Sequence, residues 1–147
     1  MSSLPSGASN QAAASGDVRQ AQEEGFKLLA LIRAYMTHGH YKADIDPLKL
    51  SEVYKGEVTS KFKKPGEEFS KLLDPAYYGF TEADMDRTFY VNLPQWGGIF
   101  GGDKKDYTLR EIVEKMEKAY CGGIGIEYMH IPDRDKCNFI REKIENR

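Results

Sequence analysis

The segment from Thr108 to Tyr120 constrains the fold of this chain more than any other part of its sequence. Thr108 lies three residues before Glu111, which is the spacing of a capping box at the start of a helix. Apolar side chains then recur at helical spacing: Leu109, Ile112, Val113, Met116 and Tyr120. Gly122 and Gly123 end the pattern. The segment therefore predicts an amphipathic helix that packs one face on a core.

Two more helices are predicted, one on each side of this segment. Asp17 can cap a helix beginning at Val18, and Gly39 is expected to end it in a left-handed conformation. Its apolar stripe consists of Leu28, Ile32, Tyr35 and Met36. Asp133 can cap a last helix, whose inward face would carry Cys137, Ile140 and Ile144.

The remaining regions are broken by glycine and proline. We expect one short turn at Phe69–Leu73, a helix over Thr81–Tyr90 that opens with a capping-box-like Thr81 and Asp84, and a loop with Trp96 over Asn92–Asp106. Alternating apolar residues predict a short extended strip at Ile124–His130, and Ser51–Glu68 is predicted to be a solvated loop. The fold class is therefore mainly α: a small helical domain with one short extended strip.

The first 16 residues carry no charged side chain and are rich in serine, alanine and glycine. Such a segment cannot offset its ordering entropy by burial, so residues 1–17 are predicted to be a disordered tail or linker and residues 18–147 one helical domain. A mitochondrial transit peptide would be arginine-rich, whereas the first arginine here is Arg19.

The charge balance excludes two classes of partner. With 21 basic and 23 acidic residues, the chain shows no basic surface suited to nucleic acid or to an anionic membrane. Its longest apolar stretch, Leu28–Ile32, is far too short to cross a bilayer, so no membrane insertion is expected. Cys121 and Cys137 lie in apolar-periodic stretches and are interpreted as buried structural thiols.

The groups that could carry chemistry have simpler structural interpretations. His38 and His40 flank Gly39 at the expected end of a helix, where the helix dipole stabilises a positively charged imidazolium. Two carboxylate runs, Asp44 with Asp46 and the cluster Glu82, Asp84 and Asp86, could attract calcium, but neither has the glycine and distal glutamate of a calcium loop. No Gly-Gly pair stands between a strand and a helix as phosphate binding requires. The residues alone therefore predict no catalytic, cofactor-binding or metal site.

Four strings in the chain go beyond these structural patterns: LIRAY…GH…ADIDPL within 31–48, LDP…YGFTEADMD within 73–86, TLREI at 108–112, and AYCG…GIEYMHI…DRDKCN within 119–138. Together they resemble the decarboxylating component of 2-oxoglutarate dehydrogenase, a thiamine diphosphate enzyme. They occur in the family's order and cover most of the chain from about Leu28 onward. Lys49 replaces the family's glycine, and the stretch Ser51–Phe69 looks longer than the family's connection.

This resemblance implies the oxidative decarboxylation of 2-oxoglutarate and succinyl transfer to a lipoyl arm, in the tricarboxylic acid cycle of the mitochondrial matrix. It also implies thiamine diphosphate and Mg²⁺ in the full subunit, and two kinds of partner: the remaining domains and a lipoyl-bearing acyltransferase. The family's Gly-Asp-Gly…Asn cofactor string is absent, since Gly102-Asp103 is followed by Lys104. The chain is therefore expected to be a helical scaffold segment upstream of the cofactor domains and inactive alone.

Four positions inside the matched strings are hypotheses for residues facing the active-site domains: His40, Asp46, Tyr128 and His130. We also expect exposed apolar faces at Leu28/Ile32/Tyr35 and Ile140/Ile144, where missing domains would pack. The alternative is a non-catalytic structural or adaptor subunit of a mitochondrial complex derived from the same domain.

Overall fold

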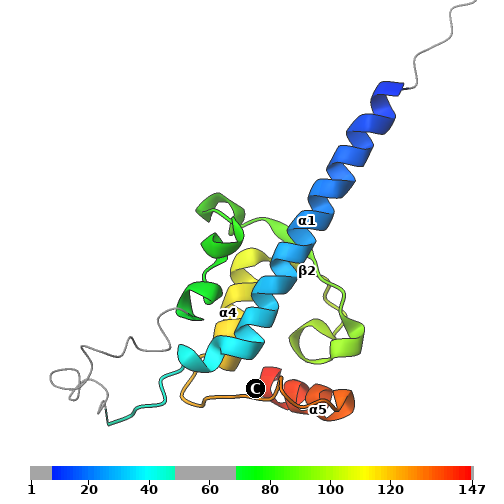
Figure 1. Ribbon diagram of the computed structural model, residues 1–147. Coiled ribbons are helices and arrows are strands. Elements are labelled where there is room, and N and C mark those ends of the chain that lie inside the picture. Colours follow the sequence, from blue (N-terminus) through cyan, green and yellow to red (C-terminus); the bar gives the residue numbers. More distant parts are fainter. Residues whose placement is uncertain (1–7, 49–68, 147) are drawn as a thin grey trace, which may run out of the picture.

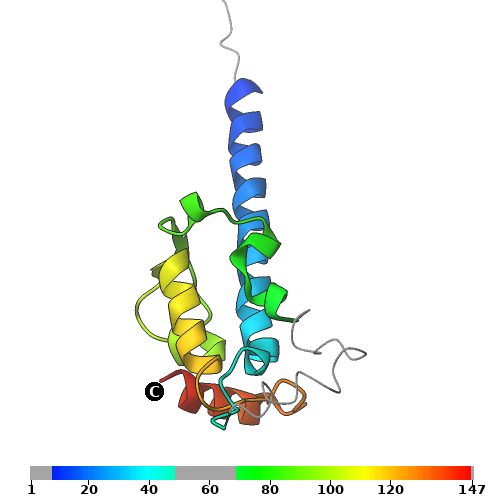
Figure 2. The same ribbon diagram turned by 90° about the vertical axis from the view of Figure 1, so that its left-hand side faces the viewer.

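The longest element is helix α1, Ala8–His38 (Figure 1). The computed structural model describes residues 8–48 and 69–146. The helix start predicted at Val18 is wrong, because α1 already includes Ala8–Asp17 of the segment expected as a tail; residues 1–7 lie outside the described residues. Alanine and glutamine are good helix formers, and extending a helix that is nucleated elsewhere costs little. Figures 1 and 2 show this N-terminal half projecting beyond the other elements.

The C-terminal half of α1 carries the centre of the core. Leu28, Ile32 and Tyr35 are only 4%, 2% and 1% exposed, because helix α4 (Leu109–Tyr120) and the short helix η3 (Lys71–Leu73) cover them. Ile144 is buried as well, and Ile140 is half-buried. The predicted stripe is confirmed, whereas the expectation that these two faces would be exposed is wrong. The chain supplies its own cover for both.

Gly39 ends α1 in a way that the sequence did not predict. The chain continues directly into the 3-10 helix η1, Gly39–Tyr41, and Gly39 is not among the glycines with positive φ. A Cβ atom at this position would lie 2.6 Å from Cβ of Tyr120. The expected left-handed stop is therefore wrong; Gly39 permits close contact between the end of α1 and the end of α4.

Helix α4 forms as predicted. The hydroxyl of Thr108 accepts a hydrogen bond from the Glu111 N–H at 3.2 Å, and the Glu111 carboxylate accepts one from the Thr108 N–H at 3.0 Å. After Tyr120 the Cys121 N–H donates to the Glu117 carbonyl at 2.8 Å. This capping box, the helix and its end before the Gly122–Gly123 pair are confirmed.

The segment before α4 contains short helical turns and the small sheet. After η3 come η4 (Pro75–Tyr78) and η5 (Glu82–Asp84), then β1 (Thr88–Tyr90). Strand β1 pairs antiparallel with β2 (Asp106–Thr108), with Thr88 opposite Thr108. The predicted turn at Phe69–Leu73 is confirmed.

Two sequence predictions about this part of the fold are wrong. The helix expected over Thr81–Tyr90 stops after one turn, because β-branched and aromatic residues at 88–90 pair with β2 instead. The extended strip lies in β1 and β2 rather than at Ile124–His130, whose backbone is irregular and ends in a turn from Tyr128 to Ile131. A strand needs a partner for its ladder, and the described residues offer none to this segment.

Helix α5, Arg134–Glu145, crosses the lower end of the molecule (Figure 2). Asp133 caps it as predicted, accepting from the N–H groups of Asp135 and Lys136. The predicted loop over Asn92–Asp106 folds into two 3-10 turns, η6 (Pro94–Trp96) and η7 (Gly98–Phe100). Turn η7 packs on α5, and the Trp96 carbonyl of η6 accepts a hydrogen bond from Arg141 of α5. Positive φ values at Gly97 and Gly98 allow the reversal between the two turns.

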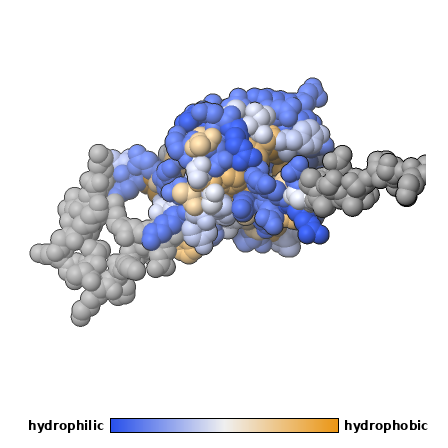
Figure 3. Space-filling model, turned by 90° about the horizontal axis from the view of Figure 1, so that it is seen from above, coloured by the Kyte–Doolittle hydropathy of each residue, from blue (hydrophilic) through white to orange (hydrophobic). Residues whose placement is uncertain are grey.

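Hydrophilic residues occupy most of the face seen in Figure 3, with smaller apolar areas between them. Large exposed apolar side chains are scattered over several elements, among them Val18, Phe26, Tyr77, Tyr90 and Phe139. Within the described ranges no helix has both the length and the apolar character needed to cross a membrane.

Candidate functional site

A buried polar network joins α4, α5 and the segment between them. The Tyr120 hydroxyl donates to Oε1 of Glu145 at 2.5 Å and lies 2.9 Å from the Tyr128 hydroxyl. Nε of Arg141 donates to the Tyr128 hydroxyl at 3.2 Å, and the Ile99 N–H donates to Oε2 of Glu145 at 2.9 Å. The network therefore connects four parts of the chain through directed hydrogen bonds.

Burial governs the acid–base behaviour of this network. Desolvation raises the pKa of Glu145, although the hydrogen bonds from Tyr120 and Ile99 partly offset it. Desolvation, followed by the charge of Glu145, raises the pKa of Tyr120, and desolvation raises that of Tyr128. The tyrosines therefore stay protonated donors, and Glu145 is the group in the network that titrates most readily.

The four positions singled out from the matched strings do not form one cluster. Tyr128 is 1% exposed and belongs to the buried network, whereas His130 is exposed and Asp46 is half-buried. Nε2 of His40 lies 3.5 Å from the Glu127 carboxylate. Within the part of the chain that the structure describes, no hydrogen bond or ion pair joins His40 to Tyr128 or His130.

The two histidines near the end of α1 have separate environments. His38 lies in the last turn of α1 and stacks on Phe69, with ring centroids 4.9 Å apart, and burial lowers the pKa of His38. His40 lies in the last turn of η1, which directly continues α1, and its buried Nδ1 has no hydrogen-bond partner among the described residues. Both histidines therefore lie in a last helical turn, as predicted, but Nδ1 of His40 makes no capping hydrogen bond to a described residue.

The acidic cluster considered for calcium is neutralised by arginines. Arg87 binds Asp84 at 2.7 Å, and Arg110 contacts both Glu82 and Asp86 at 3.2 Å. The hydrogen bond from Arg87 lowers the pKa of Asp84 to about 2. Across residues 8–48 and 69–146, no three His, Cys, Asp or Glu side chains are grouped so as to hold a metal ion.

Both cysteines are free thiols. Cys137 is buried, as predicted, and Cys121 is half-buried. Burial raises the pKa of Cys121 to about 11, so this thiol is a poor nucleophile near neutral pH.

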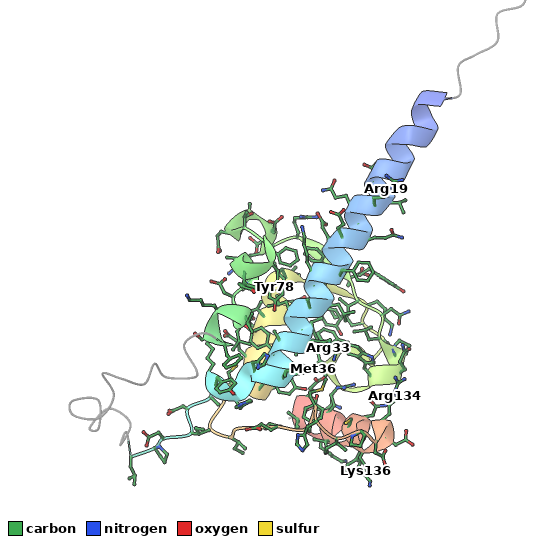
Figure 4. All side chains as sticks on the ribbon, viewed as in Figure 1. Arg19, Arg33, Met36, Tyr78, Arg134 and Lys136 are labelled. Carbon is green, nitrogen blue, oxygen red and sulfur yellow. The ribbon has the colours of Figure 1, made fainter. Side chains whose placement is uncertain are left out.

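A cleft lies between α1, η6 and α5 on the described surface. We call it the arginine cleft; its main lining residues are Arg33, Met36, Trp96, Met129, Arg134 and Arg141. Its volume is about 230 Å³, and no acidic residue lines it. Figure 4 shows Arg33 and Met36 on the C-terminal part of α1, and Arg134 at the start of α5.

Sequence reasoning did not identify this cleft. One signal was available: Arg141 lies four residues after Cys137 and three before Ile144, on the predicted inward face of the last helix. A charged residue on such a face is uncommon and indicates a partner or a binding site. The contribution of Arg33 and Trp96 depends on contacts distant in sequence.

Comparison with known proteins finds extensive similarity to one kind of enzyme. The chain is 41% identical over 131 residues to "2-oxoglutarate dehydrogenase, mitochondrial" of Dictyostelium discoideum, covering 89% of this chain but 12% of that protein. It is 36% identical over 137 residues to the protein of the same name from Saccharomyces cerevisiae, and the match covers 90% of this chain and 12% of that protein. It is 34% identical over 139 residues to the "2-oxoglutarate dehydrogenase E1 component" of Brucella anthropi, and the match covers 95% of this chain and 12% of that protein.

No family model matches the chain. The chain spans about one eighth of the length of these relatives, so the similarity concerns a segment and not a whole subunit. The chain is thus a homologue of one segment of the 2-oxoglutarate dehydrogenase subunit, consistent with an N-terminal segment of that subunit.

Proposed function

We propose that the chain is a helical scaffold segment of a 2-oxoglutarate dehydrogenase decarboxylating subunit and does not catalyse the reaction alone. The observation that carries the proposal is 41% identity over 89% of this chain combined with coverage of only 12% of the relative. The closed core of α1, α4 and α5 supports a structural role, because its apolar faces are already covered.

The reaction of the whole subunit, decarboxylation of 2-oxoglutarate and succinyl transfer, uses thiamine diphosphate with Mg²⁺. The described residues do not fit that cofactor. Glu82, Asp84 and Asp86, the densest carboxylate cluster, are paired with arginines and would bind Mg²⁺ poorly. We therefore assign no step of the reaction to this chain.

The proposed setting follows the relatives, several of which are named as mitochondrial proteins. We place the chain in the mitochondrial matrix, in the tricarboxylic acid cycle. Its immediate partners would be the remaining domains of the subunit, which in turn deliver the succinyl group to a lipoyl-bearing acyltransferase.

Within this role, His40, Asp46, Tyr128 and His130 are proposed as residues that help to position the adjoining domains. The buried Tyr128 would act through the α4–α5 network, and His40 through its contact with Glu127. Alanine substitutions at these positions in a complete subunit should lower turnover. Unchanged turnover in all four variants would refute the assignment.

Two experiments test the proposed function. The purified 147-residue chain is expected to release no carbon dioxide from 2-oxoglutarate when thiamine diphosphate and Mg²⁺ are supplied; turnover by the chain would refute the scaffold role. Deletion of the matching segment from a complete relative should abolish its activity or its assembly. If the chain instead co-purifies from mitochondria with an unrelated complex, the adaptor alternative is correct.

A further inference from the structure

The arginine cleft combines three cationic side chains with an apolar wall. Arg33 comes from α1, Arg134 and Arg141 come from α5, and Met36, Trp96 and Met129 supply the apolar surface. The chain as a whole has a formal charge of −2, yet no carboxylate lines this cleft. The positive charge is therefore concentrated at the cleft, although Glu145, which does not line it, interacts electrostatically with Arg141 within the buried network.

Arg141 is a rigid part of the cleft. Arg141 is only 7% exposed. Its Nη1 donates to the Trp96 carbonyl at 3.1 Å and to the Asn138 amide oxygen at 3.2 Å. The guanidinium carbon lies 5.2 Å from the centre of the Trp96 ring. All of these hydrogen-bond acceptors are uncharged, as is the Tyr128 hydroxyl that Nε contacts. Among the described residues Arg141 makes no direct ion pair, although it interacts electrostatically with Glu145, so its guanidinium can still attract an anion.

Arg33 and Arg134 are exposed and available for binding. In the described portion of the chain neither makes an ion pair, whereas Arg87 and Arg110 both bind carboxylates. Guanidinium groups bind carboxylate and phosphate oxygens through paired hydrogen bonds, and their affinity rises where water is partly excluded.

We propose that the arginine cleft is a binding site for a small organic anion, which presents a carboxylate or phosphate group to Arg33, Arg134 and Arg141 and an apolar body to Trp96 and the two methionines. The volume of about 230 Å³ and the recessed Arg141 favour a small ligand over a protein segment, which would need a longer groove. The inference does not depend on the proposed function, since it concerns this chain's own surface.

Trp96 makes the test direct, because it is the only tryptophan of the chain and lines the cleft. Succinate and inorganic phosphate are titrated separately into the 147-residue protein while tryptophan fluorescence is recorded. Succinamide serves as an uncharged control. A saturable change with succinate identifies a carboxylate ligand, and one with phosphate identifies a phosphate ligand.

Variants locate the binding. Arg33→Gln and Arg134→Gln, each removing one charge-assisted contact, should weaken binding about tenfold. Arg19→Gln is the matched control, because Arg19 lies on the projecting part of α1, away from the cleft (Figure 4). It removes the same charge and should change the affinity by less than about twofold at physiological salt.

Three results would overturn the proposal. The first is a fluorescence change that stays linear with both anions, and the second is equal weakening by Arg19→Gln and Arg33→Gln. The third is saturable binding of a tetraglutamate peptide while neither succinate nor phosphate binds, which would show that the cleft docks an acidic protein segment. Thermal unfolding of each variant, with and without anion, provides an independent measure of binding, because a ligand that binds only the folded state raises the melting temperature.

Discussion

Gly39→Ala tests whether close contact between α1 and α4 organises the core. The added methyl group would lie 2.6 Å from Cβ of Tyr120, 3.1 Å from the Tyr120 carbonyl oxygen and 3.4 Å from its carbonyl carbon. Carbon atoms in good contact are about 3.5–4.0 Å apart, so the ends of the two helices must separate by about 1 Å. Two of the three contacted atoms are backbone atoms, so rotation of a side chain cannot relieve the overlap.

We expect this separation to disturb buried neighbours as well. Tyr35 and Met36 precede Gly39 on α1 and are each 1% exposed, as is Tyr120. Overpacking of such a site costs about 1–3 kcal/mol, which for a chain of this size lowers the melting temperature by about 4–12 °C. Circular dichroism during thermal and urea unfolding gives both quantities.

Gly25→Ala is the matched control on the same helix. A Cβ atom at Gly25 meets nothing within 4 Å, and alanine is the better helix former, so this variant should be more stable by about 0.5–1 kcal/mol. If Gly39→Ala is as stable as the unmodified protein while Gly25→Ala behaves as expected, the argument from close helix contact is refuted.

Three further substitutions test individual interactions. Tyr120→Phe removes the hydroxyl that donates to Glu145. Because a buried carboxylate then loses a donor, the free energy of unfolding in urea should fall by about 1.5–3 kcal/mol. A typical hydrogen bond contributes about 1 kcal/mol, so a decrease below about 0.5 kcal/mol would contradict the network. Thr108→Ala removes the cap of α4 and should cost about 1 kcal/mol, and no loss would show that the capping box is unimportant. The pKa of Asp84 is lowered from 3.8 to about 2, so its bond to Arg87 stabilises the fold above pH 4 and is lost as the pH falls toward 2. The stability difference between the unmodified protein and Asp84→Asn should therefore shrink over that range, and a difference independent of pH would exclude the mechanism.

Local patterns explain which elements could be predicted. The start of α4 depends on Thr108 and Glu111, which are three residues apart, so the sequence contains the whole interaction. Asp133 at the start of α5 is a similar case, because it bonds the next two N–H groups. Helix starts of this kind can therefore be predicted without knowing the rest of the fold.

The elements that were predicted wrongly depend on distant partners. Thr81 and Asp84 make the same kind of capping box as Thr108 and Glu111. That helix nevertheless stops, because Thr88–Tyr90 pairs with a strand 18 residues further along the chain. Gly39 likewise has its role only through Tyr120. The arginine cleft requires α1, η6 and α5 together, so the inward-facing Arg141 was its one local signal in the sequence.

Helix α1 joins two regions of very different local stability. Its 31 residues correspond to a rod about 46 Å long, but only the part from about Glu24 onward is held by the rest of the molecule, where Arg87 bridges Glu24 to Asp84. Backbone hydrogen bonds before that bridge can open without exposing any core side chain, whereas those after it open only when α4 and η3 separate from α1. The Arg87 bridge therefore marks the point at which unwinding from the N-terminal end meets the cooperative unfolding of the whole chain.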